Sequence, residues 1–285
     1  IGDLYSLVES GEWTFDKMLE IANVIPANTN GNGAYRFSEP NGMAVIYANG
    51  YTVTKFNDDS TPYVEAQYPK ELSDLSDKFA PIFGDDTLCV NTKDELTGSY
   101  ENLEEKYGFT SYSEAFVDDR ILFHFTTTGG AADLRYQEVE FGILPMPKGN
   151  ASQENYITYA DPWTTFNVFV PKTTKDAHVT GVILEAMATL GSKYLRTAHY
   201  DSILRGRSTY DYQSQDMLDI IIDGKVYDII DFLTPDGCNN GHSTFVRTLK
   251  GSIQETNLGI ASKYKMQAKL VNHNITNSVI PGIMN

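Results

Sequence analysis

The chain is poor in cysteine and has no long apolar run. Its two cysteines, Cys89 and Cys238, carry neither the spacing of a metal site nor that of a disulfide framework. The two thiols can pair in an oxidising compartment or stay free, and the sequence leaves both alternatives open. No stretch approaches the roughly 18 apolar residues that a membrane-spanning helix needs. The sequence therefore predicts neither a structural metal nor a transmembrane helix.

Cations are also scarce. Lys and Arg number 22 against 38 Asp and Glu, so the formal net charge is −16. Nucleic-acid binders need clustered cations to meet the phosphate backbone, and this charge balance excludes nucleic acid as a partner. An acidic surface of this kind usually means only that the protein is soluble.

The local patterns of the common enzyme classes are absent as well. There is no G-x-S-x-G, no phosphate-binding glycine loop and no H-E-x-x-H, and the five histidines are scattered. Glycoside hydrolysis needs two carboxylates across a cleft, and nothing singles out a pair among the 38 acidic residues. We therefore predict a protein that is not an enzyme and has no cofactor. A glycan hydrolase with paired carboxylates is the alternative.

What the chain does contain is the composition of a globular protein. Apolar residues make up 41% and aromatic residues 12%, and 285 residues suffice for one large domain or two lobes. The 18 tyrosines each offer a stacking face and a hydroxyl group. Because predicted strands alternate with predicted helices along the chain, the fold class is α/β.

The stretch 113–148 carries the main evidence for this fold class. Its apolar runs and turn residues predict a strand, a turn, a helix and a second strand, over Ile121–Phe125, Thr126–Gly130, Ala131–Tyr136 and Val139–Leu144. Pro145 and Pro147 cannot donate to a sheet, so they mark the exit of the chain from it. In open α/β sheets ligands bind outside the carboxyl ends of the strands, which here means the Thr126–Gly130 turn.

Other elements follow from periodicity and capping residues. Helices are predicted from Thr14 to Ile25, over 70–79, 92–107 and 174–190, after Ser214, and as one long closing helix through 253–271. In the 174–190 helix, we expect Val182, Ile183, Ala186, Met187 and Leu190 to face inward and Gly191 to end the helix. Short strands are predicted over 156–159 and 165–170.

Three local features have two interpretations each. The loop from Asn28 to Glu39 has calcium-loop spacing but one carboxylate, so we interpret it as a polar turn without bound calcium. His124 lies inside the predicted strand and is interpreted as a hydrogen-bonded core histidine. The segment Ser38–Asn41 is either a turn that reaches a ligand cleft or the start of a helix, with Ser38 or Glu39 as its cap.

Three blocks of the sequence resemble family 1 extracellular solute-binding proteins of sugar ABC importers. The first comprises the words LYSLV at 4–8 and GEWTFDKM at 11–18. The second is the strand with Asp119-Arg120 and Phe123, its polar turn and the word FGILPMPK at 141–148. The third is DMLDII at 216–221, and the three blocks follow the order that the family shows.

The resemblance implies a periplasmic-binding-protein-like fold of type II. We expect residues 1–160 to form the first part of the C-terminal lobe, 161–204 to return to the N-terminal lobe and the hinge, and 205–285 to form a helical part that packs on the C-terminal lobe. The opening of the N-terminal lobe is expected to lie outside this chain. The implied protein is a monomer, extracellular and either membrane-anchored or periplasmic. Its implied partners are a carbohydrate ligand and the membrane permease of an ABC transporter.

The same resemblance, together with the strand ends, selects the candidate ligand residues. The family brings a Glu-Pro turn to its cleft, and Ser38-Glu39-Pro40-Asn41 stands in that place. Near the expected hinge, the chain carries an Asp-Pro-Trp word that offers a carboxylate and a stacking ring. The candidate ligand residues are Glu39, Asn41, Thr127, Thr128, Gly129, Asp161 and Trp163. A cell-surface interaction protein that does not transport sugar is a further alternative.

Overall fold

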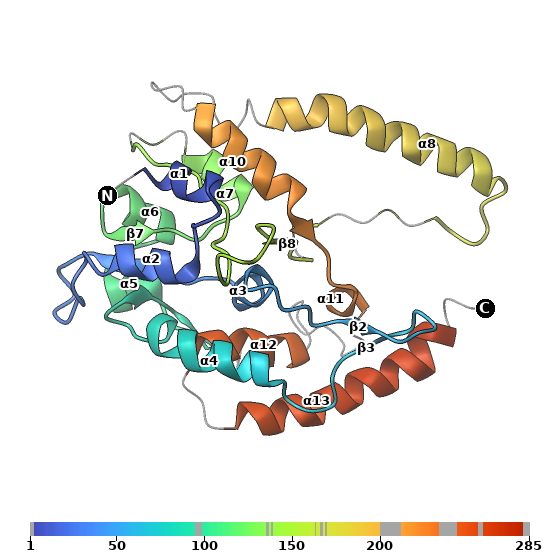
Figure 1. The fold of residues 1–285 in the computed structure, drawn as a ribbon, viewed down its shortest axis with the longest axis horizontal. Coiled ribbons are helices and arrows are strands. Elements are labelled where there is room, and N and C mark those ends of the chain that lie inside the picture. Colours follow the sequence, from blue (N-terminus) through green and yellow to red (C-terminus); the bar gives the residue numbers. More distant parts are fainter. Residues whose placement is uncertain are drawn as a thin grey trace.

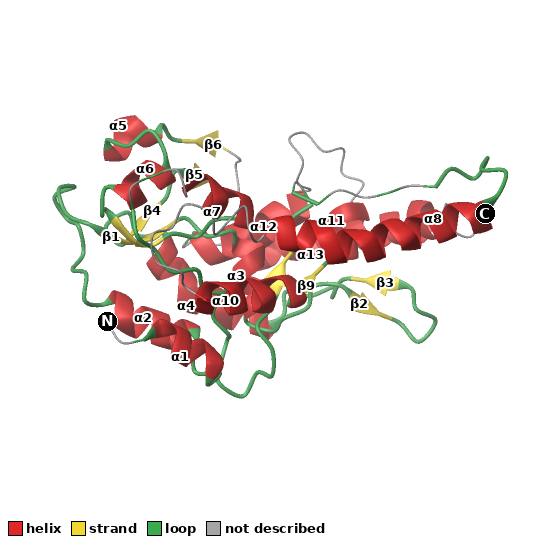
Figure 2. Cartoon of the chain, turned by 90° about the horizontal axis from the view of Figure 1, so that it is seen from above, coloured by secondary structure: helices red, strands yellow, loops and turns green. Residues whose placement is uncertain are grey.

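The computed structural model describes residues 3–94, 99–134, 137, 139–162, 164–165, 168, 170–199, 212–233, 244–255 and 259–281. They form a mixed α/β structure in which helices predominate and the strands are short (Figure 2). The helices in the first half of the chain are α1 (Leu4–Glu9), α2 (Phe15–Ala22), α3 (Gly42–Ala48), α4 (Lys70–Phe83), α5 (Leu103–Tyr107), α6 (Tyr112–Val117) and α7 (Thr128–Leu134). Those in the second half are α8 (Ala177–Leu190), α10 (Tyr212–Asp223), α11 (Ile229–Leu233), α12 (Thr244–Gln254) and α13 (Ile260–Asn274).

The described residues include a three-stranded parallel sheet with the order β4-β1-β7. Strand β1 (Tyr35–Ser38) pairs with β4 (Cys89–Val90) on one side and with β7 (Ile121–Phe123) on the other. The predicted strand at 121–125 is therefore confirmed over its first three residues. Cys89 in β4 is a buried free thiol, and burial raises its pKa well above the usual value. Cys238 lies outside the described residues.

The predicted second strand, Val139–Leu144, is wrong, and so is the predicted βαβ unit. The described residues 139–147 form no strand, and the parallel neighbour of β7 is β1 instead. The chain here runs past Trp13, whose indole Nε1 donates to the Pro145 carbonyl oxygen at 2.9 Å. Met146 lies outside any strand, as expected, but Pro145 and Pro147 do not mark an exit from the sheet, because the residues before them form no strand.

Short two-stranded pairs complete the strand inventory of the described residues. The antiparallel pairs are β2 (Lys55–Phe56) with β3 (Pro62–Tyr63) and β5 (Lys93–Asp94) with β6 (Ser99–Tyr100), and the parallel pair is β8 (Thr158–Tyr159) with β9 (Lys225–Val226). The predicted helix over 92–107 is therefore wrong where β5 and β6 lie, and among the described residues of this span only α5 is helical. Strand β8 confirms part of the strand predicted over 156–159, whereas the described residues of 165–170 form no strand.

The main core lies where α12 packs against α4, α3 and α13 (Figure 1). At Gly42 the first turn of α3 approaches the backbone of α12 so closely that a Cβ atom would lie 2.6 Å from the Cα atom of Lys250. Only glycine allows this approach without moving a helix. Fully buried side chains such as Phe79, Phe83 and Phe245 fill the space around this contact.

The predicted helix boundaries agree with the structure at some positions and not at others. Thr14 caps α2 as predicted, since its hydroxyl oxygen accepts from the Lys17 N–H at 3.2 Å. Helix α10 buries Met217 and Leu218 as predicted, although it begins before Ser214. The long closing helix is wrong: α12 and α13 are separate, and Gly259 before α13 adopts a left-handed φ of 113°.

Helix α8 departs most from expectation. It extends away from the rest of the molecule (Figure 1), and none of its residues is buried. The predicted inward face is exposed, with Val182, Ile183, Met187 and Leu190 each more than half accessible. Gly191 does not end the helix, because the chain continues as a π-helical turn, η1 (Gly191–Leu195). No helix among the described residues is both long and apolar enough to span a bilayer.

Two matched leucines test this contrast in burial. Leu72 in α4 is fully buried, whereas Leu190 in α8 is 55% exposed. We expect Leu72→Ala to lower the free energy of unfolding by about 2–5 kcal/mol, since it removes buried methyl groups and leaves a cavity. Leu190→Ala should change it by about 0.5 kcal/mol or less. Urea unfolding of both variants measures this, and equal losses would show that α8 is buried in solution.

Candidate functional site

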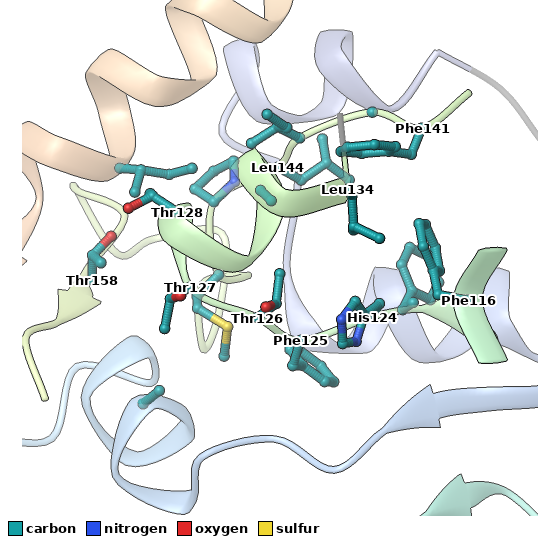
Figure 3. A pocket seen from close by; sticks show the side chains of 18 of the residues that line it. Phe116, His124, Phe125, Thr126, Thr127, Thr128, Leu134, Phe141, Leu144 and Thr158 are labelled. Carbon is teal, nitrogen blue, oxygen red and sulfur yellow. The ribbon is translucent and has the colours of Figure 1, made fainter. Parts of the chain in front are cut away.

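A large cavity opens where β7 ends and α7 begins (Figure 3). Its volume is about 2240 Å³. Polar lining comes from Thr126, Thr127, Thr128 and Gly129 of the predicted turn and from Asn41 and Asp161. Aromatic lining comes from Phe116, Phe125, Phe141, Tyr159 and Tyr227. The cavity thus joins hydroxyl, amide and carboxylate groups with aromatic faces.

The threonine turn is shaped by the start of α7. The Thr127 carbonyl oxygen accepts from the Ala131 N–H at 2.9 Å, and its hydroxyl oxygen accepts from the Gly130 N–H at 3.1 Å. A Cβ atom at Gly130 would collide with the hydroxyl group of Thr126, so a larger residue there would force the Thr126 side chain to move. The turn therefore holds three hydroxyl groups on the cavity lining at the carboxyl end of β7, the place that the sequence predicted for ligand contacts.

Asn41 and Asp161, which are 120 residues apart in the sequence, meet in this cavity. Asn41 caps α3, because its Oδ1 accepts from the Met43 N–H at 3.0 Å. Its Nδ2 donates to Asp161 Oδ2 at 2.7 Å. Of the two interpretations of Ser38–Asn41, the helix start is confirmed, but the cap is Asn41 and not Ser38 or Glu39. Asn41 also lines the cavity, so the segment fits both interpretations. The side-chain amide of Asn41 therefore caps α3 with its oxygen and holds the Asp161 carboxylate with its nitrogen.

Lys250 of α12 supports this pair, and sequence reasoning missed it. Its Nζ lies 3.6 Å from Asp161 Oδ2, and its side chain is 3% exposed against 19% for Asp161. Burial raises the pKa of Asp231 to about 6, and the positive charge of Lys250 offsets part of this rise. No sequence signal marks Lys250, because its position depends on the packing of α12 against α3.

Glu39 has a different environment from the one expected. It is not on the lining of the cavity; its carboxylate accepts from the Tyr112 hydroxyl at 2.7 Å and from Gln254 Nε2 at 3.4 Å. These contacts give Glu39 a structural role between α6 and α12. Trp163, the expected stacking residue, lies outside the described residues.

The loop after α2 closes on itself through Asn28. Its Oδ1 accepts from the Gly33 N–H at 2.9 Å, and its Nδ2 donates to the Gly33 carbonyl oxygen at 2.8 Å. Gly31 has a left-handed φ of 73°. Asn28 therefore uses its amide to hold the turn, in agreement with the interpretation of a polar turn.

Comparisons of the chain with protein-family models, with curated proteins and with solved structures found no match. The arrangement of the cavity is therefore the basis for any functional inference.

The cavity also contains His124, whose titration gives a prediction. Burial lowers its pKa to about 4 from the usual 6.5. Between these two pH values the unfolded chain binds more protons than the folded one, so the free energy of unfolding should fall as the pH falls. The slope from this residue approaches about 1.4 kcal/mol per pH unit.

The measurement is urea unfolding of the wild type and His124→Gln across this pH window. Titration of other groups, such as Asp231, contributes to both proteins and cancels in the difference. The wild type should lose stability relative to the variant as the medium is acidified. Two parallel stability curves would contradict the burial of a neutral imidazole.

Proposed function

We propose that this chain captures a carbohydrate in the described cavity and performs no chemistry on it. The observation that carries this proposal is the combination of aromatic faces with hydroxyl, amide and carboxylate groups in one cavity of about 2240 Å³. Aromatic rings pack against the C–H faces of sugars, and carboxylate and amide groups take their hydroxyl groups. The volume accommodates an oligosaccharide rather than a single small ion.

The Asn41–Asp161 pair supports this proposal because it holds a carboxylate in one orientation before a ligand arrives. One oxygen, Oδ2, is occupied by the Asn41 amide and lies near Lys250. An ionised carboxylate can accept several hydrogen bonds, so Asp161 can bind the hydroxyl groups of a ligand in addition to its protein contacts. A preoriented group costs less entropy on binding than a free one.

The wider assignment is a substrate-binding component of a sugar ABC importer with a periplasmic-binding-protein-like fold. Its support is the resemblance of the three sequence blocks together with a cavity at the carboxyl end of a parallel strand, where open α/β sheets bind ligands. In this proposal the protein works outside the cell, and a membrane permease receives the sugar.

A thermal-shift screen over mono- to tetrasaccharides, followed by calorimetry on the hits, tests the function. We expect the melting temperature to rise with at least one saccharide and the saccharide to be recovered intact. Chromatography of the recovered sugar detects turnover, which would identify a hydrolase instead. The absence of stabilisation by every saccharide would reject carbohydrate capture.

Asp161→Asn is the sharpest variant for this site. The substitution keeps the shape and an oxygen for Asn41 but removes the charge that strengthens hydrogen bonds from sugar hydroxyl groups. We expect the dissociation constant of the best saccharide to rise roughly ten- to a hundredfold. The matched control is Asp58→Asn, an exposed loop carboxylate remote from the cavity lining. Equal affinities of the two variants would remove Asp161 from the site.

A further inference from the structure

His124 carries a buried polar atom without a partner at the wall of the cavity. The residue follows β7, and its ring lies beside Phe116, with ring centroids 5.5 Å apart. Figure 3 shows His124 and Phe116 together on one side of the cavity, with Leu134 and Phe141 bordering it from another. The ring nitrogen Nε2 is buried and has no hydrogen-bond partner among the described residues.

The other ring nitrogen is held by Ser38, and this contact fixes the tautomer. The fully buried Ser38 Oγ accepts from the Phe125 N–H at 2.9 Å and lies 3.0 Å from His124 Nδ1. The serine hydroxyl hydrogen needs an acceptor, and Nδ1 is the one that the described residues provide. A neutral imidazole that accepts at Nδ1 carries its proton on Nε2. Nε2 is therefore an N–H donor.

Burial keeps this ring neutral near pH 7, because the pKa of His124 falls to about 4. The free protein therefore holds a desolvated donor without an acceptor. Buried donors of this kind are rare, since each one forgoes a hydrogen bond that water would have supplied. A ligand that brings an acceptor recovers this lost interaction on binding.

We infer that the part of the cavity around His124 and the two rings of Phe116 and Phe141 is a binding subsite for one sugar unit. A hydroxyl oxygen of that unit accepts from His124 Nε2, and the C–H face of the unit packs on the aromatic rings. Because Nε2 is buried in the free protein, binding in this subsite requires a neighbouring side chain, such as the half-buried Phe116 ring, to move. This inference rests on the proposed carbohydrate function and names the residue that selects for an acceptor at this position.

Two substitutions at His124 separate the two nitrogen positions. His124→Asn places an amide near the Nδ1 position, where it meets Ser38, but it does not reach the Nε2 position. His124→Gln is longer and carries an amide donor to the Nε2 position. We expect His124→Asn to weaken the best saccharide roughly tenfold or more and His124→Gln to retain most of the affinity. Calorimetry at pH 7 measures this, and unchanged affinity in His124→Asn overturns the inference while the carbohydrate function stands.

Nitrogen-15 NMR of the histidine-labelled wild type gives a readout that needs no variant to fold. We expect the free protein to show His124 protonated at Nε2 and unprotonated at Nδ1, and the bound saccharide to shift the Nε2 signal more than the Nδ1 signal. A proton on Nδ1 overturns the inference whatever the ligand. If no saccharide binds, the proposed function fails, and glycerol then serves as the probe: a shift at Nε2 supports the acceptor subsite, and no shift rejects it.

Discussion

The close approach of α12 to α3 at Gly42 is the constraint on which both the core and the candidate site depend. With no Cβ at Gly42, the backbone of Lys250 comes within contact of the first turn of α3. The same helix places Gln254, whose Nε2 donates to the Pro40 carbonyl oxygen at 2.6 Å. Lys250 and Gln254 thus hold the turn between β1 and α3 from one side, and this turn carries Asn41. Moving α12 outward by the width of a methyl group would disturb the core and the Asn41–Asp161 pair together.

Local chemistry explains what the sequence predicted well. The Thr14 cap, the strand at 121–123 and the buried face of α10 each depend on a few neighbouring residues and on a periodicity that the chain displays directly. The threonine turn was found for the same reason, since it follows a recognisable strand. In contrast, the role of Lys250 depends on a helix more than 200 residues from Asn41 in the sequence. A lysine in an amphipathic helix normally indicates a solvated face, and no local pattern distinguishes this one.

The errors have physical causes of the same kind. An apolar run such as 139–144 satisfies a strand pattern, but the chain uses the segment to line the cavity. The apolar stripe of α8 predicts burial, and yet the described part of the chain places nothing over it. Periodicity identifies the apolar face of a helix. Which other element packs against that face depends on how all the helices and strands are arranged in the fold. The predicted closing helix shows the reverse case, because α12 ends at Gln254 and α13 begins at Ile260 although periodicity reads the pattern as continuous.

The two polar groups of the cavity, the Asp161 carboxylate and the His124 imidazole, would contribute differently to the proposed binding. The Asp161 carboxylate is already held by Asn41 and lies near Lys250, so a ligand gains orientation from it but displaces water from a charged group. His124 Nε2 has no partner in the cavity wall, so an acceptor that reaches it replaces no hydrogen bond at that atom. In the proposed carbohydrate site, Asp161 therefore favours any ligand rich in hydroxyl groups, whereas His124 distinguishes ligands by the position of one oxygen. In that proposal the preoriented carboxylate contributes general affinity and the unsatisfied donor contributes selectivity.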